Sequence, residues 1–115
     1  MSVKIYHNPR CSKSRQTLAL LEEKGVSAEV IEYLKTPPST EELSEILTML
    51  GMAPRDLMRK KEAPYKEHGL DDPGESNEAL IAAMHANPVL IERPIVVANG
   101  KAAIGRPPEQ VLDIL

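Results

Sequence analysis

Residues 3–33 read VKIYHNPRCSKSRQTLALLEEKGVSAEVIEY and carry the patterns of three elements in turn. Apolar and polar side chains alternate over residues 3–6, which predicts a short strand. Leucines at helical spacing, with Gly25 where a C-terminal cap is expected, predict a helix over residues 12–24. A second strand is expected over residues 28–33. A strand, a helix and a strand at this spacing form a βαβ unit, so the two strands should be parallel.

The C-terminal region is predicted to form a hairpin and then a helix. Residues 95–104 read IVVANGKAAI, in which Asn99-Gly100 is the preferred two-residue turn between antiparallel strands. Pro107-Pro108 precedes apolar residues at helical spacing. Because proline is tolerated in the first turn of a helix, this pattern predicts a final helix.

The middle of the chain is predicted to be a helical block over about residues 39–87. Ser39 and Glu42 have the spacing of a capping box at a helix N-terminus. This first helix is expected to end at Gly51, and a short helix is expected over 54–61. A polar, turn-rich segment over 63–74 then precedes a third helix, which Ser76 can cap.

The predicted order of elements is therefore β-α-β, a helical insertion, and β-β-α. This is the order of the thioredoxin/glutaredoxin-like fold, an α/β fold, with the insertion between the N-terminal βαβ and the C-terminal ββα. We expect residues 1–115 to form a single domain of this kind. Its core should be aliphatic, because the chain contains no Phe and no Trp.

Composition excludes several classes of function. The net charge is −3, which argues against a nucleic-acid binder, since such proteins carry a basic surplus. One cysteine allows neither an internal disulfide nor a multi-cysteine zinc site. No apolar run is long enough to cross a membrane, and no signal-peptide pattern is present. We therefore expect a cytoplasmic protein with no membrane partner, and nothing demands more than a monomer.

Cys11 is the centre of the predicted chemistry. It follows the first strand and opens the first helix, where the helix dipole favours a thiolate. Three basic residues, Arg10, Lys13 and Arg15, and a nearby His7 should favour it further. Ser14 stands where a Cys-x-x-Cys motif would have its second cysteine, so an external thiol must resolve Cys11. A tyrosine-phosphatase loop is excluded too, because residue 17 is Thr and not Arg.

Three arginines are candidates for binding a tetrahedral oxyanion beside the thiolate. Arg93 precedes Pro94, and in a thioredoxin fold the proline before the third strand is usually cis and lies beside the reactive cysteine. Arg106 precedes Pro107, and Arg59 lies in the helical insertion. Each guanidinium can donate two parallel hydrogen bonds to an oxyanion. The other basic residues of that insertion, Arg55, Lys60 and Lys61, are expected to be solvated surface charges.

The chain closely resembles the glutaredoxin-dependent arsenate reductases over essentially its whole length. The resemblance rests on five stretches in matching order: Tyr6–Arg15, Leu57–Lys60, Ala63–Tyr65, Ile91–Val97 and Gly105–Pro107. Longer family members continue with a C-terminal tail after the point where this chain ends.

This resemblance implies a role for each matching residue. Cys11 would attack arsenic(V) and displace water, while the arsenate would be bound by Arg59, Arg93 and Arg106. His7 would support the thiolate, and Ser14 and Arg15 would shape the oxyanion cradle. Glutathione would then attack the adduct as a co-substrate, glutaredoxin would regenerate Cys11, and no cofactor would be bound.

Two other interpretations remain open on the sequence. Some proteins of this fold bind RNA polymerase and regulate transcription; the chain resembles them in fold and in its Arg-Pro strand motif, but it lacks their Cys-x-x-Cys. A general monothiol oxidoreductase acting on glutathione mixed disulfides is the other alternative. Such an enzyme has little need for three guanidiniums aimed at its thiol.

Overall fold

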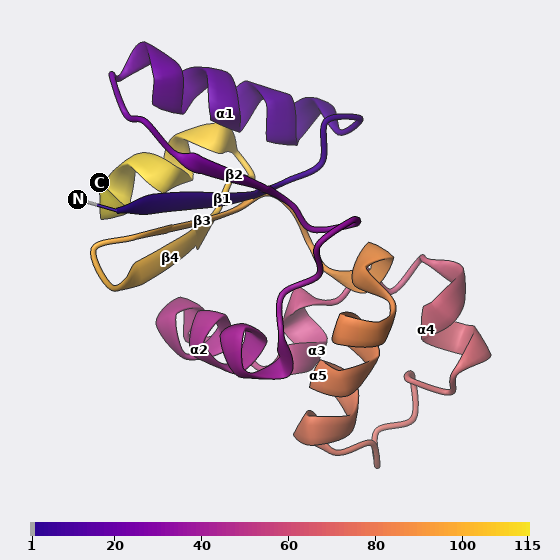
Figure 1. The fold of residues 1–115 in the computed structure, drawn as a ribbon. Coiled ribbons are helices and arrows are strands. Elements are labelled where there is room, and N and C mark those ends of the chain that lie inside the picture. Colours follow the sequence, from indigo (N-terminus) through magenta and orange to yellow (C-terminus); the bar gives the residue numbers. More distant parts are fainter. Residues whose placement is uncertain (1) are drawn as a thin grey trace. The chain divides into compact units, whose positions relative to one another are not determined.

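A computed structural model describes residues 2–115, which divide into two compact units (Figure 1). The sheet unit comprises the residues up to Thr36 together with Arg93–Leu115, and the helical unit comprises Pro37–Glu92. The helical unit falls where the helical insertion is expected, with slightly wider bounds. That residues 1–115 act as one domain stays a prediction.

The sheet unit contains a four-stranded mixed sheet in the order β2-β1-β3-β4. Its elements are β1 (Val3–His7), α1 (Ser12–Glu23), β2 (Glu29–Glu32), β3 (Ile95–Ala98), β4 (Lys101–Ile104) and the 3₁₀ helix η2 (Pro108–Ile114). Strands β1 and β2 are parallel, while β3 is antiparallel to both β1 and β4. The predicted βαβ unit, the hairpin and the thioredoxin-like fold are thus confirmed.

Local geometry explains both ends of this unit. Asn99 and Gly100 have φ of 56° and 71°, the left-handed values that a two-residue hairpin turn requires. The last helix lies where it is expected, but it is 3₁₀ and not α. Its bonds join residues three apart, as from Gln110 N–H to Pro107 O at 3.1 Å. The prediction of an ordinary α-helix is therefore wrong here, although the helix begins at the predicted prolines.

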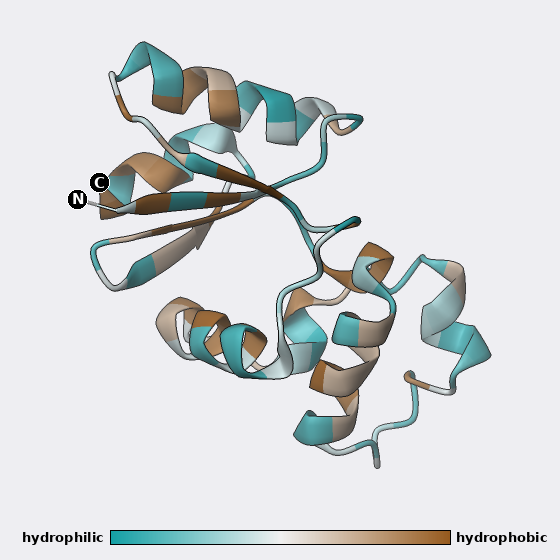
Figure 2. Ribbon diagram, in the orientation of Figure 1, coloured by the Kyte–Doolittle hydropathy of each residue, from teal (hydrophilic) through white to brown (hydrophobic). Residues whose placement is uncertain are grey.

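The core of the sheet unit is aliphatic, as expected. Val3 and Ile5 of β1 pair with Ala98 and Val96 of β3, and all four are buried. Leu21 of α1 and Val111 of η2 complete this cluster, so the two helices cover one face of the sheet (Figure 1). Figure 2 shows hydrophobic residues concentrated along the strands. This packing holds the β1–α1 connection, and Cys11 within it, in a fixed place.

The helical unit consists of α2 (Thr40–Leu50), α3 (Pro54–Leu57), α4 (Ala63–Glu67), α5 (Asn77–Ala86) and the 3₁₀ helix η1 (Pro88–Leu90). The capping box is confirmed: Ser39 Oγ accepts from Glu42 N–H, and Glu42 Oε1 accepts from Ser39 N–H, both at 3.1 Å. Gly51 ends α2 with a φ of 66°, and Ser76 caps α5. No helix in residues 2–115 is both long and apolar enough to cross a membrane.

Three predictions in this unit are wrong. The helix expected over 54–61 ends at Leu57, because Met58 pairs with Ile91 as an isolated β-bridge and is drawn into an extended conformation. The segment expected to be turn-rich contains the helix α4. Arg55, expected to be solvated, instead donates to the Tyr65 hydroxyl at 2.7 Å and to two backbone carbonyls beyond α4. A tertiary contact of this kind leaves no periodic signal in the sequence.

Candidate active site around Cys11

The loop that delivers Cys11 is fixed by its own hydrogen bonds. Asn8 Oδ1 accepts from Arg10 N–H, and Asn8 O accepts from Cys11 N–H, both at 3.0 Å. Arg15 Nη1 donates to Pro9 O at 2.9 Å, which ties α1 back to the loop. An asparagine side chain that bonds the backbone two residues on stabilises such a turn. Cys11 is thereby held as the N-cap residue of α1.

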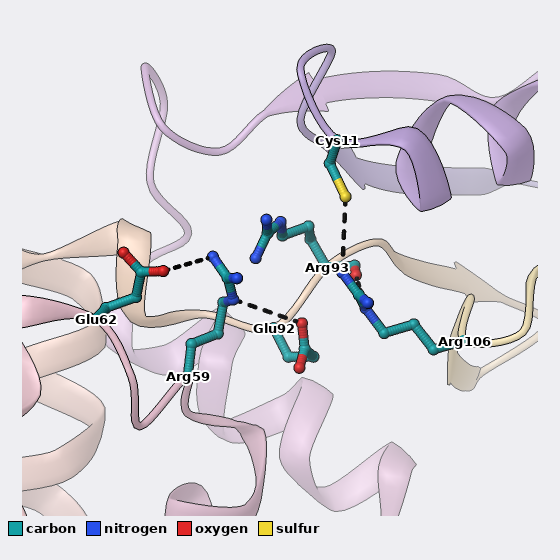
Figure 3. A network of polar contacts seen from close by, with 6 residues as sticks. All are labelled: Cys11, Arg59, Glu62, Glu92, Arg93 and Arg106. Atoms are coloured by element: carbon teal, nitrogen blue, oxygen red, sulfur yellow. Dashed lines mark hydrogen bonds and ion pairs between the residues drawn. The ribbon is translucent and has the colours of Figure 1, made fainter.

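The Cys11 side chain meets a cation. Its sulfur accepts a hydrogen bond from Arg106 Nη2 at 3.6 Å, and the residue is only 9% exposed (Figure 3). Cys11 does not cap α1 with its side chain, so the sulfur remains directed at the guanidinium. The contact thus places a positively charged donor beside the sulfur, at the N-terminus of α1. This contact is what a nucleophilic cysteine requires.

The Arg106 side chain is oriented by the backbone of the segment around Arg93 and Pro94. Its Nε donates to the Arg93 carbonyl at 2.8 Å (Figure 3), so the residue before Pro94 holds the guanidinium. Both Arg93-Pro94 and Arg106-Pro107 are cis peptides, which confirms the expectation for Pro94. Gly105 N–H donates to Pro94 O at 3.0 Å, which joins the two Arg-Pro segments.

Gly105 is a site residue that sequence reasoning missed. A Cβ at this position would lie 2.8 Å from Pro94 Cγ and would collide with the hydroxyl of Thr17 on α1. Only glycine therefore lets the Gly105–Pro107 segment approach α1 closely enough for Arg106 to reach the sulfur. Its position next to a motif arginine is the one signal in the sequence that could have indicated this role.

His7 and Ser14 form a buried pair beneath the loop, with exposures of 6% and 0%. His7 Nδ1 lies 2.6 Å from Ser14 Oγ, which also accepts from Asn8 N–H at 3.0 Å. Burial lowers the pKa of His7 below 6.5; the Glu32 carboxylate opposes this and Arg15 adds to it. The imidazole is therefore neutral at neutral pH. The expectation that His7 supports the Cys11 thiolate stays a prediction; the contact that His7 makes is with Ser14, which in turn accepts from Asn8.

The role of Ser14 and Arg15 in shaping the oxyanion cradle stays a prediction, and both residues make contacts within the loop. Ser14 is fully buried against His7 and Asn8, and Arg15 binds the Pro9 carbonyl. Both residues stabilise the loop that carries the thiol.

Arg59 belongs to the helical unit, where two carboxylates neutralise much of its charge. Its guanidinium lies 2.9 Å from Glu62 Oε2 and 3.8 Å from Glu92 Oε1 (Figure 3). A backbone hydrogen bond also fixes the position of Arg59, since its N–H donates to Leu90 O at 2.6 Å. The role of Arg59 as an oxyanion ligand stays a prediction. Its two acidic partners had no signal in the sequence analysis.

Comparison with known proteins places the chain in a family. The ArsC family model matches residues 6–114. The chain is 64% identical to the uncharacterized protein YfgD of Escherichia coli K12, over 98% of this chain and 96% of that protein. It is 56% identical to an arsenate reductase of Neisseria meningitidis serogroup A, over 98% and 97% of the two chains.

Solved structures agree with the observed fold. An arsenate reductase from Vibrio cholerae is 60% identical and superposes with a TM-score of 0.97, covering 100% of this chain and 98% of that one. The protein titled YFFB (PA3664) is only 17% identical, yet it reaches a TM-score of 0.82 over 99% of both chains. That second likeness concerns the fold alone.

Proposed function

Because the chain belongs to the ArsC family, we propose that it reduces arsenate to arsenite through the Cys11 thiolate, with glutathione and glutaredoxin as the reductant. The observation that carries this proposal is the hydrogen bond of 3.6 Å from Arg106 Nη2 to Cys11 Sγ. It brings the sulfur and a guanidinium that can bind an oxyanion to the same point. The proposal is supported by relatives named arsenate reductase that are 48% to 56% identical over nearly the whole chain.

In the first step, the Cys11 sulfur attacks arsenic(V). A sulfur–arsenic bond forms, and one arsenate oxygen takes up a proton and leaves as water. Negative charge is concentrated on the remaining oxygens as this happens, and preorganised guanidiniums stabilise such charge. Arg106 is already at the sulfur. Arg93 and Arg59 are proposed as the further ligands of the oxyanion.

In the second step, the thiolate of glutathione attacks the Cys11 sulfur. A disulfide bond forms, the sulfur–arsenic bond breaks, and its electron pair stays on arsenic, which becomes arsenic(III). Each sulfur has then lost one electron. The chain has one cysteine, so it cannot resolve this mixed disulfide itself. A glutaredoxin thiol takes over the glutathione by exchange, and Cys11 is regenerated.

The same proposal covers the setting of the reaction. It requires no bound cofactor, since glutathione is consumed as a co-substrate. It assigns the protein to the cytoplasm, where thiol pools remain reduced, and it is complete with a monomer. Phosphate matches arsenate in shape and charge and should compete for the site without reacting, because a thiol does not reduce phosphorus(V).

The direct test is arsenite formation by the purified protein with glutathione and glutaredoxin. The wild type should produce arsenite, and Cys11→Ser should produce none above the rate without enzyme. Ser12→Ala is the matched control, because Ser12 is the exposed neighbour of Cys11 and should retain activity. Arsenite formation that persists in Cys11→Ser would refute the proposed nucleophile. Its absence in the wild type would refute arsenate as the substrate.

A further inference from the structure

A pocket of about 320 Å³ opens in the sheet unit where the parallel strands β1 and β2 end. His7 and Glu32 are register partners at these ends and both line it. The remaining lining comes from the Cys11 loop, through Asn8, Pro9 and Arg10, and from the turn after β2, through Leu34 and Lys35. The carboxyl ends of parallel strands are where α/β proteins most often bind ligands.

This pocket adjoins the nucleophile but is separate from the arginines of the oxyanion site. Asn8, which lines it, accepts a hydrogen bond from Cys11 N–H at 3.0 Å, and Arg10 directly precedes Cys11. Neither Arg93 nor Arg106 is among the lining residues. A ligand in the pocket and an oxyanion at Arg106 would therefore use different groups.

The lining combines apolar surface with charges of both signs. Leu34 is 44% exposed, which is unusual for a large aliphatic side chain in this chain, and it stands beside the exposed Pro9. Arg10 and Lys35 supply two cations, and Glu32 supplies an anion. Lys35 Nζ lies 3.5 Å from Glu32 Oε1, and the two side chains are 80% and 44% exposed. An exposed ion pair of this kind is weak, so a charged ligand can replace either partner.

We propose that this pocket binds glutathione while its thiol attacks at Cys11, an inference that rests on the proposed function. Glutathione carries two carboxylates and one ammonium on a short peptide. Arg10 and Lys35 match the carboxylates, Glu32 matches the ammonium, and Leu34 and Pro9 cover the peptide between them. A tripeptide spans at most about 10 Å. With its ends bound beside Arg10, its central cysteine is therefore within reach of the next residue along the chain, Cys11.

The kinetic test follows the mixed disulfide between Cys11 and glutathione by mass spectrometry, with saturating arsenate and no glutaredoxin. Lys35→Glu replaces an attraction for a carboxylate with a repulsion. The glutathione concentration for half-maximal rate should rise about fivefold, as expected for one exposed charge pair. Lys24→Glu is the matched control, because Lys24 is an equally charged, exposed residue of the same unit outside the pocket.

A thiol without carboxylates separates docking from reactivity. With 2-mercaptoethanol in place of glutathione, Lys35→Glu and Lys24→Glu should react at the wild-type rate. If Lys35→Glu slows the reaction with both thiols equally, the residue affects Cys11 itself and the docking proposal is wrong. If both glutamate variants raise the glutathione requirement equally, only the net charge matters, and the proposal is wrong as well.

A binding measurement keeps this test independent of arsenate. S-methylglutathione cannot react, and its titration into the Cys11→Ser protein can be followed by NMR. The backbone amides of Asn8, Leu34 and Lys35 should shift, and the shifts should weaken in Lys35→Glu but not in Lys24→Glu. This result would stand even if the wild type reduced no arsenate. Saturating titration without shifts at these amides would overturn the pocket whatever the substrate proves to be.

Discussion

Two arginines of this chain are held in opposite ways. Arg106, in the sheet unit, is aimed by a neutral group, the Arg93 carbonyl, and it reaches the Cys11 sulfur. Arg59, in the helical unit, is ion-paired with Glu62 and Glu92. A carbonyl orients a guanidinium without cancelling its charge, whereas carboxylates orient it and weaken its attraction for an anion. Arg106 should therefore matter most for the thiolate, and the carboxylates should moderate Arg59.

The largest effect is expected when Arg106 is replaced. Arg106→Lys keeps the charge but loses the planar guanidinium, whose separate N–H groups donate to a carbonyl and to the sulfur at the same time. We expect the rate of arsenite formation at saturating arsenate to fall about 100-fold, which is typical for the loss of one preorganised donor. The rate of Cys11 alkylation by iodoacetamide at pH 7 should fall as well, because the sulfur loses the guanidinium N–H that donates to it.

Lys101→Arg is the control for Arg106→Lys, since Lys101 is an exposed residue of β4 at the hairpin turn. It should leave both rates unchanged. If Arg106→Lys retained a third or more of the wild-type activity, the contact with the sulfur would be incidental and the contrast with Arg59 would disappear.

The next effect concerns the backbone that brings Arg106 to the thiol. Gly105→Ala places a Cβ against Thr17 and Pro94, both packed in the sheet unit. We expect the free energy of unfolding, measured in urea, to fall by about 1–3 kcal/mol, the usual range for an overpacked site. Thr17→Ala should restore part of this loss in the double variant, because it removes the hydroxyl that the new Cβ meets.

Gly74→Ala provides the comparison for this prediction. Its Cβ would lie 3.3 Å from the Asp72 carboxylate oxygen and would meet no backbone. The unfolding free energy should therefore change much less than in Gly105→Ala. Equal losses in the two variants would mean that Gly105 has no special place in the site.

The sheet unit could be predicted closely because its signals are local. Alternation in β1, the Asn99-Gly100 turn and the capping residues each act within a few positions, and all of them appear as expected. The same holds for Cys11, because the residues on either side of it predict a strand before it and a helix after it. Pro94 was expected to be cis only through the fold, and the structure agrees.

What the sequence left undetermined depends on contacts between distant residues. The bridge from Met58 to Ile91 shortens α3, and Arg55 binds carbonyls 15 and 17 residues away. Neither contact has a period that could be recognised beforehand. The lowered pKa of His7 could not be predicted for the same reason, because burial lowers it and burial is a property of the folded chain.

A smaller effect should come from releasing Arg59. Glu62→Gln removes the nearer of its two carboxylates while preserving the shape of the side chain. If Arg59 binds arsenate, the KM for arsenate should fall about two- to fivefold, which is the scale of one partly exposed ion pair. Glu62→Gln combined with Arg59→Gln should show no such gain. An unchanged KM in the single variant would place Arg59 outside the oxyanion site.

The smallest effect concerns the pH dependence of stability through His7. Its folded pKa lies below the ordinary 6.5, so the folded protein binds fewer protons than the unfolded chain as the pH falls through that value. Stability from the neutral imidazole is fully present above pH 6.5 and is lost as the pH drops below it. His7→Asn keeps a polar atom near the position of Nδ1, close to Ser14, but it does not titrate. The difference in unfolding free energy between wild type and variant should therefore shrink from pH 7.5 to pH 5.5. A constant difference would show that His7 is protonated as easily in the folded state as in the unfolded chain, with the Glu32 carboxylate balancing burial.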